Sequence, residues 1–164
     1  MVLCKVLGVL ILLVAGGYVS VAVTRLERKR LRVLDGYISL LLYIKGQIGC
    51  YAMPVRDILT SADPAMLAAC RGETYQGIVQ PVLPLPEMIR DSRVYLEPES
   101  ERLLCAFSSE LGHTFREEQV TRCDYYIEAL GEERRRLAES VPARARMNSA
   151  LSLCCAIGAA ILLW

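Results

Sequence analysis

An uncharged apolar segment followed at once by a basic run is the feature that most constrains this chain. Val6 to Val23 contains no charged residue. At about 1.5 Å per residue, this segment would form a helix of roughly 27 Å, close to the ~30 Å hydrocarbon core of a bilayer. We therefore expect residues 1–24 to form an N-terminal transmembrane helix.

Positive charge is concentrated on one side of this segment. Only Lys5 precedes it, whereas five bases and a single acid follow it closely. The positive-inside rule then predicts that the chain beyond Val23 lies in the cytoplasm. The same bases would face anionic lipid headgroups. The residues expected to set topology and contact lipid are Arg25, Arg28, Lys29, Arg30 and Arg32.

A cleaved secretory signal is the alternative interpretation of the N-terminus. Lys5 could supply its charged start, and Ser20-Val21-Ala22 has the small-x-small pattern of a cleavage site. However, the apolar stretch is longer than the ~7–15 residues usual in a signal core. The basic run beyond it also resists translocation. A membrane anchor is therefore the favoured interpretation.

The C-terminus carries a second uncharged segment, from Met147 to Trp164. Its terminal tryptophan suits a membrane interface. Because the bases near this segment precede it, its N-terminal side is expected in the cytoplasm, which places both chain termini outside. We assign residues 147–164 to a C-terminal transmembrane helix. The preceding bases are Arg134, Arg135, Arg136, Arg144 and Arg146.

The segment between the two apolar ends is electrically balanced. Of 19 basic and 18 acidic residues, all except Lys5 lie between Arg25 and Arg146. This neutrality argues against nucleic-acid binding, which needs a surplus of positive charge. The seven cysteines include no C-x-x-C pair, so neither a disulfide framework nor a zinc site is expected. No cofactor or metal is predicted.

Apolar residues in this middle segment recur at helical spacing. They predict two long helices that leave the membrane together and pack antiparallel. The first should weaken near Gly46 and Gly49 and stop before Pro54. We expect residues 25–146 to form an all-α cytoplasmic bundle. The expected stripes are Leu31, Leu34, Ile38, Leu41 and Ile48 on one helix, and Val120, Cys123, Ile127, Leu130, Leu137 and Val141 on the other.

Proline and capping residues predict short helices between the two long ones. One is expected from Pro54 to Thr60. Asp63 is a candidate N-cap before Pro64, and Gly72 could close that helix. The proline-rich stretch that follows is expected to be a packed loop with a short helix from Pro86 to Ser92.

The turn between two further helices has clear local signals. Pro98 suits a first helical position, and Gly112 suits a left-handed cap after an apolar stripe. Thr114-x-x-Glu117 is a capping box that would open the next helix. His113, the only histidine, is expected on the surface of this turn. The apolar stripe comprises Leu103, Leu104, Phe107 and Leu111.

Over nearly its whole length the chain resembles the stage III sporulation protein AB family of endospore-forming bacteria. The resemblance rests on the two apolar ends, on the stretch from Gln47 to Leu59, and on Phe107-x-x-x-Leu111-Gly112 leading to Arg116-Glu117-x-Gln119. The chain departs from the pattern at Phe115, where an acid is common. The family-motif and capping positions are Tyr51, Pro54, Phe107, Leu111, Gly112, Thr114, Glu117 and Gln119.

The resemblance implies a bundle similar to the cytoplasmic domain of the type II secretion F platform protein. It also implies a complex that links mother cell and forespore, with this chain on the mother-cell side of the outer forespore membrane. Its partners would be a secretion-type ATPase and other small membrane subunits, and it could form a homo-oligomer. The alternative is a membrane-anchored enzyme or small transport component, although no nucleotide-hydrolysis, acyl-transfer or zinc-protease motif occurs.

Acidic residues are frequent in the part of the chain farthest from the predicted membrane. Such charges could steer a partner, because complementary charge accelerates encounter. The alternative is a solvated face that keeps the domain soluble. The candidate steering residues are Glu97, Glu99 and Glu101.

Overall fold

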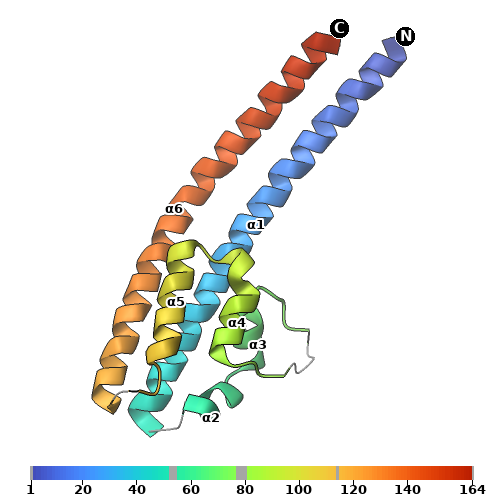
Figure 1. The fold of residues 1–164 in the computed structure, drawn as a ribbon. Coiled ribbons are helices and arrows are strands. Elements are labelled where there is room, and N and C mark those ends of the chain that lie inside the picture. The colour runs from blue at the N-terminus through green and yellow to red at the C-terminus, as the bar shows by residue number, and fades with distance from the viewer. Residues whose placement is uncertain (1, 52–54, 77–80, 114, 164) are drawn as a thin grey trace. The chain divides into compact units, whose positions relative to one another are not determined.

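The computed structural model describes residues 2–51, 55–76, 81–113 and 115–163, which are all-helical with no strand (Figure 1). The expected all-α bundle is confirmed. The helices are α1 (Val2–Tyr51), α2 (Val55–Thr60), α3 (Pro64–Cys70), α4 (Leu85–Ser92), the 3-10 helix η1 (Arg93–Tyr95), α5 (Pro98–Glu110) and α6 (Arg116–Leu163).

The chain divides into two compact units. One consists of residues 1–28 and 138–164, which are the N-terminal part of α1 and the C-terminal part of α6. The other is residues 29–137, and it contains the hydrophobic core. The boundaries predicted from the sequence, after residues 24 and 146, lie in the same two helices and stay predictions.

The described residues of both expected membrane spans, 2–24 and 147–163, have helical backbone and belong to α1 and α6. Most side chains of these two segments lie outside the described residues. Among the side chains that the structure does describe, no helical stretch is both long and apolar enough to cross a membrane. The spans and the topology are therefore not supported by the structure and stay predictions.

The residues of α1 that face the core differ in part from the predicted stripe. Leu34, Leu41 and Ile48 are buried as expected, but Ile38 is only partly buried. The sequence reasoning missed four core residues of α1, because the helix is enclosed by several neighbours and buries a wide face. These are Val33, Tyr37, Leu40 and Ile44, all with no exposed surface.

The helix α1 is not interrupted at its glycines, and the predicted weakening there stays a prediction. The helix continues through Gly46 and Gly49 and ends at Tyr51, before the proline as expected. A glycine costs a helix about 1 kcal/mol relative to alanine. Burial of Ile44 and Ile48 on either side of Gly46 offsets this cost, because most helix stability in proteins comes from packing.

The predicted antiparallel packing of α1 and α6 is confirmed within the 29–137 unit. Lys45 pairs with Asp124, and Asp35 pairs with Arg134. A ten-residue step forward along α1 is thus matched by a ten-residue step back along α6. The α6 side of this contact buries Cys123, Tyr126, Leu130 and Leu137, whereas the predicted Val120, Ile127 and Val141 are only partly buried.

The helix α3 lies very close to α1. A Cβ atom added to Gly36 would lie 2.8 Å from the Cys70 backbone nitrogen, so only glycine permits this approach. Asp63 caps α3 as predicted, because its carboxylate accepts a hydrogen bond from the Ala65 backbone N–H at 2.8 Å. Gly72 closes α3 as predicted, with φ +70°.

Helix α4 begins at Leu85, one residue before the predicted start, and continues into η1. Its buried Ser92 lies 2.7 Å from the Tyr37 hydroxyl, and Ser92 also hydrogen-bonds the Met88 carbonyl. This polar contact satisfies a phenol and a hydroxyl that would otherwise be costly to bury. The first turn of α2 follows Pro54, which lies outside the described residues.

Candidate functional site

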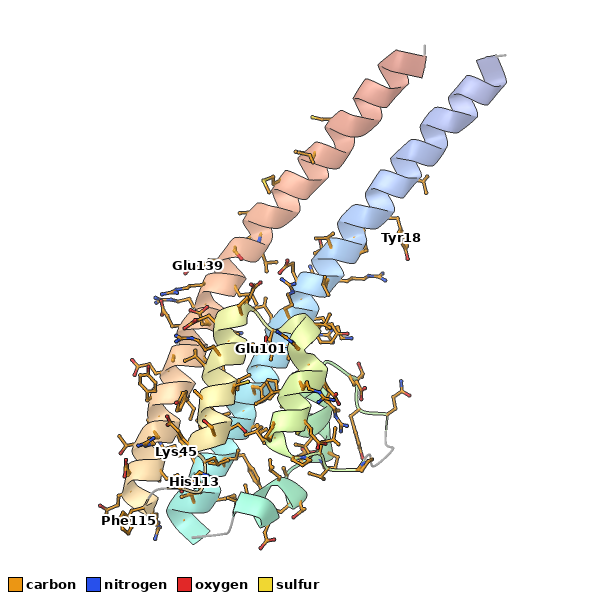
Figure 2. The ribbon with its side chains drawn as sticks, viewed as in Figure 1. Tyr18, Lys45, Glu101, His113, Phe115 and Glu139 are labelled. Carbon is orange, nitrogen blue, oxygen red and sulfur yellow. The ribbon has the colours of Figure 1, made fainter. Side chains whose placement is uncertain are left out.

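The turn between α5 and α6 contains most of the predicted motif residues. Gly112 adopts φ +87°, which confirms the predicted left-handed conformation. The preceding Leu111 donates its backbone N–H to the Phe107 carbonyl at 3.0 Å. His113 is exposed in the turn, as predicted (Figure 2). Thr114 lies outside the described residues, so the hydroxyl half of the predicted capping box is not described.

Two phenylalanines near this turn have opposite environments. Phe107 is buried and meets the ring of Tyr126 edge to face, with ring centroids 5.4 Å apart. Phe115 is 89% exposed immediately before α6, at the same end of the bundle as His113 (Figure 2). A large aromatic side chain held this far into solvent is a natural anchor for a protein partner.

Arg122 joins the two helices that flank the turn. Its guanidinium donates to Glu118 at 2.8 Å within α6 and to Glu110 at 2.7 Å at the end of α5. Hydrogen bonds to Glu118 and then to Glu110 raise the pKa of Arg122. Burial, and then a hydrogen bond to Glu110, raises the pKa of the Tyr126 phenol. The turn is therefore clamped by charge next to the exposed Phe115.

The remaining motif residues do not gather at one point. Gln119 is buried, and its Nε2 has no hydrogen-bond partner among the described residues. Glu117 is exposed in the first turn of α6. Tyr51 is the last residue of α1, with its side chain outside the described part, and Pro54 lies outside it altogether. The motif therefore marks a helix connection rather than a set of convergent catalytic groups.

Each candidate steering acid is paired with an arginine. Glu97 accepts a hydrogen bond from Arg30 at 2.9 Å. In addition, Glu99 pairs with Arg102, and Glu101 pairs with Arg93. The hydrogen bond from Arg102 lowers the pKa of Glu99. Three arginines, one of them from α1, thus pair with the three acids, and the steering role of these acids stays a prediction.

The predicted lipid-facing bases separate into two groups. Arg25, Arg28 and Arg32 are exposed, whereas Lys29 and Arg30 are half-buried with specific partners. The Lys29 ammonium donates to the Tyr95 hydroxyl at 2.8 Å and lies 4.3 Å from the centroid of that ring. Sequence reasoning missed these contacts because the partners are more than sixty residues apart in the chain. It could have found the Glu118–Arg122 pair from its i,i+4 spacing.

The residues that the structure describes include no cluster of His, Cys, Asp and Glu suited to a metal ion. Cys123 is buried as predicted, and burial raises the pKa of its thiol to about 11. Cys105, by contrast, is exposed. It falls outside the buried face of α5, which is set by Leu103, Leu104 and Phe107.

Comparison with known proteins gives one match. A model of the stage III sporulation protein AB family matches residues 83–164, which is half of the chain and includes α4, η1, α5 and α6. No curated protein and no solved structure matches the chain. The family match supports a role in sporulation.

Proposed function

Since this chain belongs to the stage III sporulation protein AB family, we propose that it is a non-enzymatic membrane platform subunit of a secretion-like complex between mother cell and forespore. In this complex it docks a secretion-type ATPase and contacts other small membrane subunits. The bundle acts as a rigid support, and the function lies in its surface.

Membrane anchoring is proposed from the sequence. Two segments without charge, Val6 to Val23 and Met147 to Trp164, are each flanked by bases on the side nearer the middle of the chain. A pair of spans with this charge pattern would hold residues 25–146 in the cytoplasm. Reporter fusions at Met1 and Trp164 test the topology. Activity of a cytoplasmic reporter at either end would contradict it.

The observation that carries the docking proposal is the exposure of Phe115 beside the Arg122 clamp. This aromatic lies within the family-matched part of the chain. The clamp fixes the helix end that presents the ring, so little conformational entropy is lost when a partner binds. Protein interfaces concentrate binding energy in such aromatic anchors surrounded by polar groups.

The experiment measures binding of the purified full chain to the secretion-type ATPase. Phe115→Ala is expected to weaken binding about fivefold or more, as for an interface residue worth about 1 kcal/mol or more. Because the ring is 89% exposed, the substitution should leave the unfolding midpoint unchanged. A loss of binding by Phe115→Ala could therefore not be attributed to unfolding of the protein.

Val94→Ala is the matched control. Val94 is also a large exposed apolar residue, with 72% of its surface accessible. It lies in η1, which precedes α5 in the chain. The neighbouring Arg93 pairs with Glu101 of α5, which places η1 near the start of that helix. The 13-residue helix α5 separates it from the turn by about 20 Å. Equal affinities for wild type and Phe115→Ala would exclude the turn as the docking surface.

A further inference from the structure

A cavity of about 500 Å³ lies within the 29–137 unit, between α1, α3 and the loop that follows α3. This volume falls in the range of small-molecule sites and greatly exceeds the space of one water molecule. The lining is mixed, with apolar side chains from α3 and polar groups from several elements. The polar lining residues include Lys29, Thr60, Arg71, Glu73, Thr74 and Gln76.

Arg71 is held at this cavity by the end of α3. Its backbone N–H donates to the Ala68 carbonyl and the next N–H, of Gly72, donates to the Ala69 carbonyl, which fixes Arg71 as the C-cap of the helix. Its Nε is buried and has no hydrogen-bond partner among the described residues. The Arg71 side chain lines the cavity, and none of the described residues accepts a hydrogen bond from its Nε, so the guanidinium is not already paired there and can contact an anionic ligand.

Lys29 brings a second positive charge from α1. Its ammonium is held by the Tyr95 hydroxyl and ring, neither of which neutralises it. The structure shows no carboxylate paired with Lys29 in the part of the chain that it describes. An ammonium has three N–H donors, and Tyr95 takes one of them.

Gly72 allows the two cationic residues to approach one cavity. A Cβ atom at this position would lie 2.9 Å from Lys29 Cε and 3.1 Å from Val33 Cγ2. The residue also has φ +70°, a conformation that favours glycine. The loop can therefore turn directly after Arg71 while the stem of Lys29 passes against it.

We propose that this cavity binds a phosphomonoester, with Arg71 and Lys29 contacting the phosphate. A planar guanidinium and a compact ammonium together match the several oxygens of a dianionic phosphate. The hydroxyl of Thr74 adds a neutral donor to the lining, whereas the Thr60 hydroxyl already donates to the Asp57 carbonyl at 2.8 Å. The rest of the ligand, such as the glycerol of a glycerol phosphate, faces the other polar residues of the lining.

The phosphomonoester could be a soluble metabolite or the headgroup of a lipid, and two arms distinguish these sources. The first titrates sn-glycerol 3-phosphate into the full chain in neutral detergent micelles and follows the heat of binding. The second adds phosphatidic acid to the same micelles and follows the unfolding midpoint. Phosphatidic acid carries the same phosphomonoester on a lipid, so the two arms differ only in the source of the group.

Saturable binding in the first arm assigns a soluble ligand, and stabilisation in the second arm alone assigns a lipid headgroup. In either case Arg71→Gln should weaken binding about tenfold or more, because charge-assisted hydrogen bonds to the phosphate are lost. Lys29→Gln should act in the same direction. Arg71→Gln breaks no described side-chain hydrogen bond, so it tests the site even if Lys29→Gln disturbs the packing of Tyr95.

Arg90→Gln is the matched control, since Arg90 is exposed on α4 and does not line the cavity. Its affinity should equal that of the wild type. Absence of binding in both arms would overturn the proposal. Binding that Arg71→Gln leaves unchanged would overturn it equally, because the anion would then be held elsewhere.

Discussion

Two arginines in the same bundle, Arg122 and Arg71, have opposite surroundings. Arg122 lies at the α5–α6 turn and pairs with Glu110 and Glu118. Arg71 lies at the end of α3, where its buried Nε has no partner among the described residues. Arg122 therefore joins two helices by charge, whereas Arg71 has the surroundings of the proposed ligand-binding residue.

Other ion pairs also connect separate helices of the bundle. Long-range pairs join α1 to α6, and Arg30 in the middle of α1 pairs with Glu97 just before α5. Exposed pairs of this kind contribute little free energy each, so they fix register more than they stabilise. Stability comes from the buried residues around Tyr37, Leu104 and Leu130, which have no exposed surface.

Alkaline pH should produce the largest effect, to which Cys70 and Tyr37 near Arg71 contribute together with Cys123 and Tyr126 near Arg122. Burial raises the pKa of the Cys70 thiol from 9.0 to about 12, and burial also raises the pKa of Tyr37 above its ordinary 10.0. Both groups must stay protonated in the folded state. The free energy of unfolding should therefore hold below about pH 9 and fall at higher pH, by up to about 1.4 kcal/mol per pH unit for each group.

Urea unfolding between pH 8 and pH 11 measures this dependence. Cys70→Ala should make the decline shallower, although it also changes packing at neutral pH. The Arg122 clamp should persist over the same range, since its hydrogen bonds to Glu118 and Glu110 raise the pKa of Arg122 above its already high ordinary value. A midpoint that stays constant up to pH 11 would show that Cys70 is accessible to solvent.

The close contact of α1 with α3, which positions Arg71, should be the next most sensitive feature. Gly36→Ala would place a Cβ atom 2.8 Å from the Cys70 backbone nitrogen and 2.9 Å from the Ala69 backbone carbon. These neighbours are backbone atoms of α3, which cannot move aside as the flexible end of a side chain can. We expect a loss of about 1–3 kcal/mol in the free energy of unfolding.

Gly46→Ala is the matched control for this substitution. No atom lies within 4 Å of a Cβ added to Gly46, and the position is exposed in the same helix. Alanine there should stabilise the domain by about 0.5–1 kcal/mol through its higher helix propensity. Equal effects of the two substitutions would contradict the α1–α3 contact.

Replacing the two contrasting arginines by methionine should change stability in opposite directions. Without added phosphate, Arg71→Met removes a buried donor that lacks an acceptor, so we expect a gain of about 1 kcal/mol. Arg122→Met removes contacts to Glu110 and Glu118, so we expect a small loss. Chemical denaturation of both variants in phosphate-free buffer measures this. A large loss for Arg71→Met would mean that this side chain stabilises the fold.

The smallest expected effect concerns the pair of Lys45 and Asp124, which sets the α1–α6 register. A double-mutant cycle with alanine at both positions should give a coupling free energy of about 0.2–1 kcal/mol, because the pair is largely exposed. The coupling should decrease at high salt. Zero coupling at low salt would leave Asp35 and Arg134 as the pair that defines the register.

The sequence by itself determined the helices and their ends. Asp63, Gly72 and Gly112 act on backbone groups a few residues away, so their effects can be read from local spacing. The apolar stripes likewise predicted two long antiparallel helices. The register of the two long helices and the depth at which each residue is buried were harder to predict. An apolar stripe does not reveal how many neighbouring elements will cover a helix. Tyr37 and Ile44 were missed for this reason.

Only the tertiary structure decided which side chains meet. Lys29 contacts Tyr95, and Arg30 contacts Glu97, each across more than sixty residues of chain. The orphaned Nε of Arg71 and the exposed ring of Phe115 depend equally on what other helices cover. Caps and turns are fixed by atoms within one helical turn. Pairing and burial depend on packing between distant segments, which no local pattern encodes.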